Sequence, residues 1–395
     1  MNQIEKMLQD YCPNGVEWKE LGDREVAKLS RGKVMSKQFL EENKGVFPVY
    51  SSQTANSGEI GKISTFDFDG EYITWTTDGA NAGTVFYRQG KFSITNVCGL
   101  VDIQNDKLLT KFVYYYLTIT TKKYVSSGMG NPKLMSNVMA KIKIPIPPLE
   151  IQEEIVKILD KFTEYVTELT AELTAELTLR QKQYNYFRDY LLNFDSDSSG
   201  GANNKVYQVE WKTLGDIAKL KNGKDWKSLS VGDVPVYGSG GAMGEFVSEY
   251  AYNKPTVLIP RKGSISNLFY LEKPFWNVDT IYYTEIDDSQ VVPRYLYYYL
   301  TTIDLESMAT NPTRPSLTQA ILDKIPIPVP SLPIQQRIVQ VLDNFDAVCN
   351  DLNIGLPKEI ELRQKQYEYF REKLLTFTAE GVYTDSTVQY STDKT

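Results

Sequence analysis

The chain has no histidine, only three cysteines and no long apolar run. The absence of imidazole excludes Ser-His-Asp and Cys-His catalysis, histidine-ligated metal sites and Cys₂His₂ zinc fingers. Cys12, Cys98 and Cys349 stand alone without CxxC spacing, so we expect neither a zinc ribbon nor disulfides, as is typical of a reducing cytoplasm. No stretch approaches the ~18 apolar residues of a membrane span, and the first residues lack a signal-peptide core. We therefore expect a soluble, cytoplasmic protein with no membrane partner.

The length of 395 residues predicts two to three domains. The 43 basic and 50 acidic side chains give a formal net charge of −7. This charge is uneven along the chain. Residues 16–147 carry 17 basic against 13 acidic side chains, whereas residues 209–330 carry 12 against 14. Most of the excess acidity therefore lies outside these two segments.

An internal repeat organises the chain. Four blocks recur in the same order, so the chain is one unit duplicated. The interiors between the first and third blocks share little identity and differ in length, whereas the segments after the third block match well. A duplicated frame with diverged inserts suggests two modules that have the same function but act on different targets. The matching blocks are 16–23 with 209–216, 111–118 with 294–301, 144–147 with 325–328, and 179–184 with 362–367.

Each insert predicts short strands separated by turns, because aromatic and β-branched runs alternate with Gly, Asn and Asp. Helical pieces are expected around 114–118 and 297–301, which makes the fold class α+β. Because the tyrosine triplets at these two places recur in both copies, we interpret them as packing residues, and Trp18 and Trp211 as structural. The predicted strands are 45–50, 72–75, 84–87, 234–237, 256–259 and 268–270, with turns at 56–58, 78–79, 89–90, 238–241 and 262–263.

A helical period follows each insert. From residue 151 to residue 177, apolar residues recur in 4-3-4 steps, which predicts a nearly straight helix from Leu149 to Asn193, about 65 Å long. So wide a stripe needs a partner, either the equivalent stripe of the other copy or the helix's own module, and its length favours the first. Thr-Ala-Glu-Leu occurs twice in succession, at 170–173 and 174–177. Pro357 is expected to kink or interrupt the second helix.

These patterns divide the chain into six segments. The segment 195–205 has the composition of a flexible linker, and the last segment is polar. The predicted boundaries are 1–147 for the first module, 148–194 for the first long helix, 195–205 for the linker, 206–330 for the second module, 331–378 for the second long helix and 379–395 for the tail.

This arrangement resembles the specificity subunits of type I restriction–modification systems, the HsdS family. The resemblance covers nearly the whole chain and rests on VEWKELGD at 16, IPIPPLEIQEEIVKILDKF at 144, LRQKQYNYFRDYLL at 179, their second copies and the TAEL pair. It implies two α/β target-recognition domains, joined by two long conserved helices packed as an antiparallel coiled coil with approximate internal two-fold symmetry. Each domain would read one half of a bipartite, asymmetric DNA target, and the helices would act as a ruler between the half-sites.

The resemblance also implies partners. Two modification subunits would dock on the helices, carry S-adenosylmethionine and methylate adenine at N6. Restriction subunits, with translocase and nuclease activity, would join them and use ATP and Mg²⁺. The chain itself would hold no cofactor and no metal.

Motifs for chemistry within the chain are missing. A methyltransferase would carry Asn/Asp-Pro-Pro-Phe/Tyr, but Asn131-Pro132 is followed by Lys133 and Asn311-Pro312 by Thr313. Residues 79–83 hold a glycine pair without GxGxxG. We therefore expect no catalytic residue and no activity of the chain by itself. Two alternatives stay open: a non-catalytic, two-module protein-binding scaffold and a self-contained DNA enzyme.

Candidate DNA readers are polar or basic residues on turns, where side chains can reach base edges. The alternative interpretation is a structural one, in which such Asn, Asp and Ser side chains form hydrogen bonds with their own backbone. Arg261, Lys262 and Arg314 are the favoured readers, because an exposed arginine beside Gly or Pro has little structural purpose. The first module offers Arg31, Lys33, Ser52, Gln53, Asn56, Thr76, Asp78, Asn81 and Lys133, and the second offers Lys221, Lys224, Ser239, Arg261, Lys262, Ser264, Asn267, Thr313 and Arg314.

Overall fold

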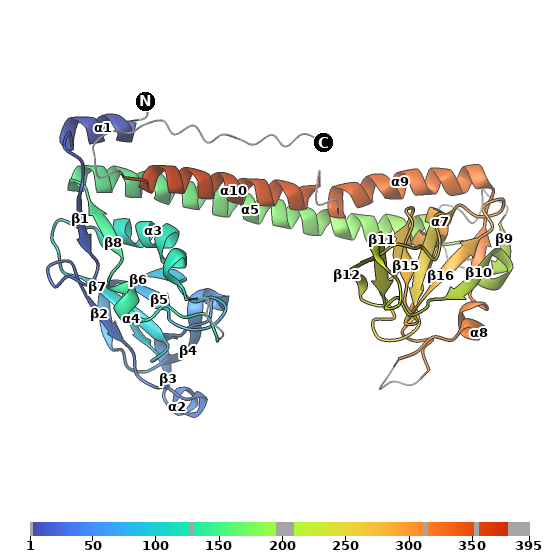
Figure 1. Ribbon diagram of the computed structural model, residues 1–395, viewed down its shortest axis with the longest axis horizontal. Helices are drawn as coiled ribbons and strands as arrows, with labels where there is room; N and C mark the ends of the chain where they lie inside the picture. The colour runs from blue at the N-terminus through green and yellow to red at the C-terminus, as the bar shows by residue number, and fades with distance from the viewer. Residues whose placement is uncertain (1–2, 127–129, 195–208, 311–314, 351–354, 378–395) are drawn as a thin grey trace. The chain divides into compact units, whose positions relative to one another are not determined.

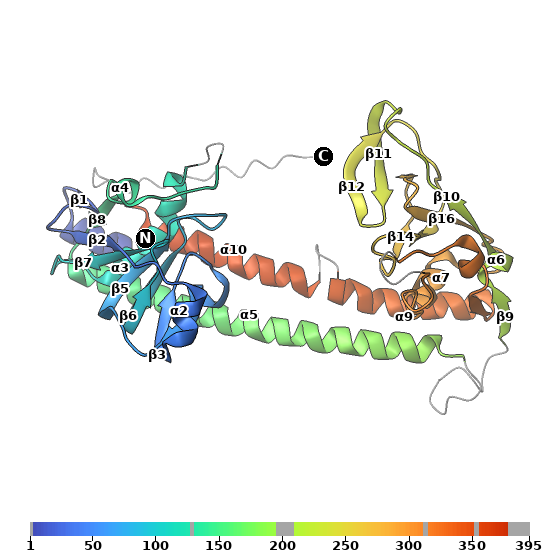
Figure 2. The ribbon, with the colours of Figure 1, turned by 90° about the horizontal axis from the view of Figure 1, so that it is seen from below.

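The structure is a computed structural model that describes residues 3–126, 130–194, 209–310, 315–350 and 355–377. The chain divides into two compact units, one of residues 1–170 with 362–395 and the other of residues 171–361. Each unit contains one module and segments of the long helices (Figures 1 and 2). The mixture of helix and strand confirms the α+β class. The predicted linker at 195–205 and the tail at 379–395 lie outside the described residues.

The first module is built on a six-stranded sheet in the order β2-β7-β5-β6-β3-β4. Neighbouring strands are antiparallel except β3 and β6, which pair parallel. Helix α3 lies between this sheet and α5 (Figure 1), over a core centred on Trp75, Phe112 and Leu117. The elements are α1 (Gln3–Tyr11), β1 (Glu17–Glu20), β2 (Ala27–Arg31), α2 (Lys37–Glu42), β3 (Lys44–Tyr50), η1 (Ala55–Gly58), β4 (Glu59–Ile63), β5 (Phe68–Thr76), β6 (Val85–Ile94), β7 (Cys98–Ile103), α3 (Thr110–Thr120), η2 (Thr121–Tyr124), α4 (Ser136–Met139), β8 (Lys143–Ile146) and α5 (Leu149–Leu192).

One predicted turn of this module is wrong. Strand β6 runs through Gln89 and Gly90 instead of ending there. Gly90 pairs with Gly70 of β5, and the two have φ of +85° and +142°. Two glycines at facing positions allow a backbone conformation that larger residues rarely adopt, so the ladder continues across the pair.

The second module splits its strands between a four-stranded sheet, β10-β16-β13-β14, and a three-stranded sheet, β12-β11-β15. Figure 2 shows the β11–β12 hairpin projecting from the rest of the module. Its core contains Tyr295, Leu296 and Tyr298 of α7. The elements are β9 (Glu210–Thr213), α6 (Leu214–Ile217), β10 (Ala218–Asn222), β11 (Val231–Gly238), β12 (Gly241–Val247), β13 (Thr256–Pro260), β14 (Phe269–Leu271), β15 (Trp276–Asn277), β16 (Ile281–Ile286), α7 (Pro293–Leu300), α8 (Gln319–Leu322), β17 (Pro326–Val329), α9 (Leu332–Asn350) and α10 (Leu356–Leu375).

The repeated sequence blocks meet at the base of each module. In the first unit, β1 of the Val-Glu-Trp-Lys block pairs antiparallel with β8 of the Ile-Pro-Ile-Pro block, with Trp18 opposite Pro145. In the second unit, β9 pairs with β17 in the same way, with Trp211 opposite Pro328. The two ends of each diverged insert are therefore joined by the same two-stranded ladder.

A buried glutamine ties each module to its long helix. Gln152 Oε1 accepts a hydrogen bond from the Leu109 N–H at 2.9 Å, and its Nε2 donates to the carbonyls of Lys107 and Pro147, both at 2.7 Å. Gln335, the equivalent residue, makes the same three bonds with Val292, Gln290 and Pro330. Both glutamines are fully buried. Moving the helix relative to its module would break these bonds and leave buried main-chain groups unpaired. The contacts therefore fix the angle between module and helix.

A carboxylate makes the second connection. Asp160 of α5 accepts hydrogen bonds from Lys111 Nζ and the Tyr115 hydroxyl, each at 2.7 Å. In the other unit, Asp343 accepts from Arg294 Nε at 2.6 Å and from the Tyr298 hydroxyl at 2.5 Å. This explains the repetition of the tyrosine triplets. Their role as packing residues is confirmed for Tyr115, Tyr116, Tyr298 and Tyr299, which are buried.

The first long helix is confirmed as α5, which runs from Leu149 to Leu192. Helix α9 ends at Asn350 and α10 begins at Leu356, and Gly355 before it forms a bend, so among the described residues the second helix is interrupted beside Pro357, as predicted. In the first unit α5 packs antiparallel on α10, with 5.6 Å between the rings of Phe162 and Phe370. In the second unit it packs on α9, with 5.4 Å between Phe187 and Phe345. The prediction that each stripe packs on the other copy's helix is therefore confirmed.

Candidate DNA interface

Five segments of the first module meet to form one surface, which we call the first rim: residues 31–36, 51–58, 76–81, 94–97 and 130–136. Main-chain hydrogen bonds join them. The Lys33 N–H donates to the Ile94 carbonyl at 3.2 Å, Thr95 to Tyr50 at 2.9 Å, Thr77 to Val97 at 3.3 Å and Leu134 to Thr77 at 2.9 Å. The rim is thus a fixed set of turns and not a set of independent loops.

The nine candidate readers of the first module all lie on this rim. Asp78 lies 3.8 Å from Lys133 Nζ, and Asn81 Nδ2 donates to the Thr54 hydroxyl at 3.1 Å. Arg31 donates from Nε to the Ser136 hydroxyl at 3.3 Å. Arg31, Lys33, Gln53, Asn56, Asn81 and Lys133 are exposed, whereas Ser52 and Asp78 are partly buried.

Thr76 is a correction. Its side chain is 0% exposed, its hydroxyl donates to the Asn81 carbonyl and it accepts from the Thr84 N–H at 3.1 Å. The residue therefore holds the turn that presents Asn81, as Ser and Thr commonly do, and cannot itself reach a base.

Sequence reasoning missed Arg88, a buried arginine of β6 behind the first rim. Its guanidinium donates from Nη2 to the Ser57 carbonyl at 2.6 Å and from Nε to the Thr74 hydroxyl at 3.0 Å, and lies 3.5 Å from the centre of the Tyr50 ring. Burial lowers the pKa of this guanidinium from its ordinary value. No carboxylate of the described residues lies within ion-pair distance of it. In this strand apolar residues alternate with polar ones, so the local sequence does not distinguish Arg88 from a surface arginine.

Arg88 supports the most unusual backbone of the rim. Asn56 and Ser57 have φ of +49° and +52°, and Gly58 has +86°. A positive φ raises the conformational free energy of any residue except glycine. Asn56 and Ser57 therefore need a stabilising contact from outside the turn. The bond from Arg88 to the Ser57 carbonyl supplies it, and thereby sets the direction of the Asn56 side chain.

Replacing Arg88 with Met is expected to relax the sequence preference of the first module by about tenfold, because the unsupported 56–58 turn no longer presents Asn56 in one orientation. If each module reads one half-site, as the resemblance implies, the preference of the second module should stay unchanged. Methylome sequencing of cells that carry the variant measures both. Gln89→Met, an exposed neighbour on the same strand, is the matched control; equal relaxation in both variants would contradict the role of Arg88.

The second rim is built from residues 222–227, 238–241, 261–267, 277–280 and 316–317. Here too main-chain bonds join the segments. Lys224 N–H donates to the Asn277 carbonyl at 2.9 Å, Val278 to Tyr237 at 3.0 Å, Arg261 to Thr280 at 3.0 Å and Leu317 to Arg261 at 2.9 Å. The same kind of surface therefore recurs on the second module, with different side chains.

Six of the nine candidates of the second module lie on this rim. Lys221 lies on β10, just before the rim, and pairs with Glu285 at 3.3 Å. Thr313 and Arg314 fall outside the described residues, so their contacts stay a prediction. Lys224, Lys262, Ser264 and Asn267 are exposed, and Lys221, Ser239 and Arg261 are partly buried.

The argument that favoured Arg261 is wrong in one respect. This arginine has a structural purpose, because its Nη1 donates to Asn222 Oδ1 at 3.0 Å and its guanidinium lies 5.3 Å from the Tyr282 ring centre. Contact with a base would have to compete with these bonds. Of the two tryptophans predicted to be structural, Trp18 packs edge-on against Tyr116 at 6.2 Å, whereas Trp211 lies in the β9–β17 ladder and is 46% exposed.

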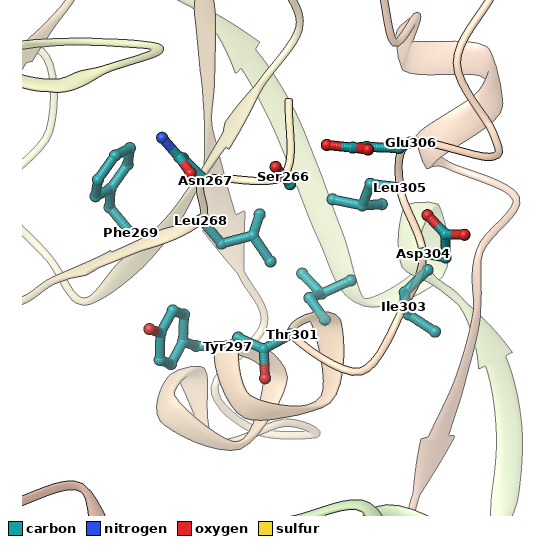
Figure 3. Close-up of a pocket in the computed structure, with 11 residues that line it drawn as sticks. Ser266, Asn267, Leu268, Phe269, Tyr297, Thr301, Ile303, Asp304, Leu305 and Glu306 are labelled. Carbon is teal, nitrogen blue, oxygen red and sulfur yellow. The ribbon is translucent and has the colours of Figure 1, made fainter. Parts of the chain in front are cut away.

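A cavity of about 400 Å³ lies next to Asn267 (Figure 3). Leu268 and Tyr297 line it together with the carboxylates of Asp304 and Glu306, and none of the described residues that line it is Lys or Arg. An anionic wall repels phosphate, so this cavity does not extend the candidate DNA interface.

The three thiols are poor nucleophiles. Burial raises the pKa of Cys12 and Cys349 above the ordinary value and that of Cys98 to about 12, which disfavours the thiolate that such chemistry requires. Within the described ranges, three or more His, Cys, Asp or Glu side chains nowhere gather as a metal site would need. None of the described helices is both long and apolar enough to cross a bilayer.

The fold defines a class of protein with two modules built on one repeated frame. Each module has a rim of turns and is bonded to a pair of long helices. The family model for the type I restriction modification DNA specificity domain matches residues 13–179 and again 208–362, so the chain belongs to this family. A Mycoplasma pneumoniae protein described as a type I specificity subunit is 33% identical over 362 residues, covering 89% of this chain and 95% of its own. The specificity subunit of the type I restriction enzyme MpnII, from the same organism, is 44% identical over 171 residues, 43% of this chain and 52% of its own.

Solved structures have the same fold. The S subunit of a type I restriction–modification system from M. genitalium matches with a TM-score of 0.50 at 21% identity, covering 92% of this chain and 97% of that one. A chain from a study of complex assembly and conformational transition of the type I system matches with a TM-score of 0.58 at 17% identity, covering 92% and 98%.

Proposed function

We propose that the chain reads a bipartite, asymmetric DNA target, one half-site with each rim. The observation that carries this proposal is that two modules repeat one frame, down to equivalent glutamine and aspartate contacts, while the side chains on their rims differ. A shared frame gives a shared way of docking on duplex DNA, and different side chains give different base contacts.

The long helices offer docking sites for two copies of one partner. Tyr186 of α5 and Tyr369 of α10 occupy equivalent positions two residues after the repeated LRQKQY segment and are 63% and 49% exposed. Exposed tyrosines at equivalent positions are typical of interface anchors. The partners we propose are two modification subunits, which bind S-adenosylmethionine and methylate adenine, joined by restriction subunits that use ATP and Mg²⁺. The chain supplies specificity and leaves the chemistry to them.

Charge supports this division of work. The second module carries a net charge of −2 between residues 209 and 330, a poor match for a polyanion that is bound mainly by neutralised phosphates. Partner subunits would then supply part of the cationic surface. We expect the isolated chain to bind its target weakly at physiological salt.

Deleting the gene tests the function. Single-molecule methylome sequencing with and without it should show the loss of one bipartite N6-methyladenine motif, and the chain should copurify with its modification subunits. Complementation with the wild-type gene is the control. A protein-binding scaffold would leave the methylome unchanged, and that result would refute the proposal.

A further inference from the structure

Two short segments of related sequence, one in each module, end at equivalent positions of the two rims. Strand β2 and the residues after it read Lys-Leu-Ser-Arg-Gly-Lys (28–33), and β10 with its following residues reads Lys-Leu-Lys-Asn-Gly-Lys (219–224). The segments share the first lysine, the leucine, the glycine and the lysine that follows it, although the inserts around them have diverged.

The glycine fixes where each lysine begins. A Cβ added to Gly32 would lie 1.9 Å from the Ile94 carbonyl oxygen, and one added to Gly223 would lie 2.1 Å from that of Val278. The next N–H then bonds the neighbouring strand, Lys33 to Ile94 at 3.2 Å and Lys224 to Asn277 at 2.9 Å. Only glycine permits so close an approach of two backbones. The lysines are therefore placed by main-chain contacts that do not depend on the variable side chains.

Both ammonium groups are available to a ligand. The Lys33 side chain is 75% exposed and forms an ion pair with Asp67 at 2.7 Å. An exposed ion pair of this kind contributes little to stability, so a phosphate can replace the carboxylate. Lys224 is exposed, and no carboxylate of the described residues forms an ion pair with it. The residues before the glycines, Arg31 and Asn222, differ in charge and shape.

We propose that Lys33 and Lys224 each bind a backbone phosphate at the equivalent position of their half-site, and that they set the register of the two rims without reading sequence. This inference rests on the proposed function. Two half-sites of different sequence share only the sugar-phosphate backbone, so a contact that the repeated frame places identically must address that shared chemistry. The neighbouring residues Arg31 and Asn222 differ between the modules and bond other residues of their own rims, Ser136 and Arg261, so they would present different groups to the two half-sites.

The test uses the full chain in complex with its modification subunit. Binding is measured on DNA that carries the methylated motif and on DNA with both half-sites scrambled, across a salt series. Lys33→Ala and Lys224→Ala should each weaken both DNAs by the same factor, lower the salt slope by about one, and leave the methylated motif unchanged. Lys33→Arg and Lys224→Arg should restore the slope.

Lys28→Ala and Lys219→Ala are matched controls. They remove the same charge from exposed positions at the other end of the same segments, about 16 Å away along the strand, and should change the slope less. A relaxed base at one position of either half-site in the Lys33 or Lys224 variants would make them base readers and overturn the proposal. Unchanged affinity and slope would overturn it as well, while the wild-type complex still discriminates the two DNAs. A wild-type complex that binds both DNAs equally overturns the proposed function itself.

Discussion

Deleting one of the two TAEL tetrapeptides, residues 174–177, is expected to abolish methylation of the original target and to create methylation of a new one. The new target should keep both half-sites and have a spacer shorter by roughly one to two base pairs. Four residues shorten a helix by about 6 Å and turn it by about 40°, and B-DNA rises about 3.4 Å per base pair. The tetrapeptides lie inside the continuous helix α5, where the two compact units divide.

We expect the deletion to be tolerated for two structural reasons. In the described part of the chain α9 and α10 are two helices with a bend at Gly355 before the second, so α5 is not held to its length by one continuous partner. The removed segment also lies outside both buried cores. Methylome sequencing gives the new spacer directly. Glu172→Ala, which keeps the length and removes an exposed side chain of the same repeat, should leave the spacer unchanged; a deletion variant that methylates the original motif would show that α5 is not the ruler.

Removing the last turn of the second long helix is expected to destabilise the first module, not the second. Leu375 and Phe377 are buried in the first module's core, where the Phe377 ring lies 6.0 Å from Phe112 in an edge-to-face arrangement. Phe→Ala in a core typically costs about 3–5 kcal/mol. Phe377→Ala should therefore lower the free energy of unfolding of the first module by about 3 kcal/mol.

The first helix offers the matched variant. Phe194, at the equivalent position after α5, is buried with Leu192 in the second module's core. Phe194→Ala should destabilise the second module by a similar amount. Hydrogen exchange separates the two, since β5 and β7 should lose protection in one variant and β13 and β16 in the other. Loss of protection in the second module for Phe377→Ala, or in the first module for Phe194→Ala, would contradict this prediction.

The repeat made the frame predictable, because each copy served as a check on the other. The repeat located α3 and α7, the apolar period located α5, and Pro357 marked the start of α10. The repeat did not reveal that the repeated blocks pair with each other as β1–β8 and β9–β17, because strand pairing is a long-range contact that the local pattern does not encode.

The candidate site was less predictable for a physical reason. Turn composition placed most readers on the rims, but composition cannot separate a side chain that faces DNA from one that holds the turn. Thr76 and Arg261 satisfy their polar groups inside the module, and Arg88 supports the rim from a strand. Each of these roles depends on a partner at least eight residues away in sequence, such as Ser57 for Arg88, so only the folded chain shows it.

The buried glutamines have a consequence for how the target can change. Because Gln152 and Gln335 fix each module to its helix, any change in helix length also swings the module around the helix axis. One added residue rotates the following part of the helix by about 100°, whereas four residues rotate it by only about 40°. Under the proposed function, the length of the spacer can therefore change only in discrete steps. Each step is close to a whole helical turn, and a tetrapeptide is the shortest such step.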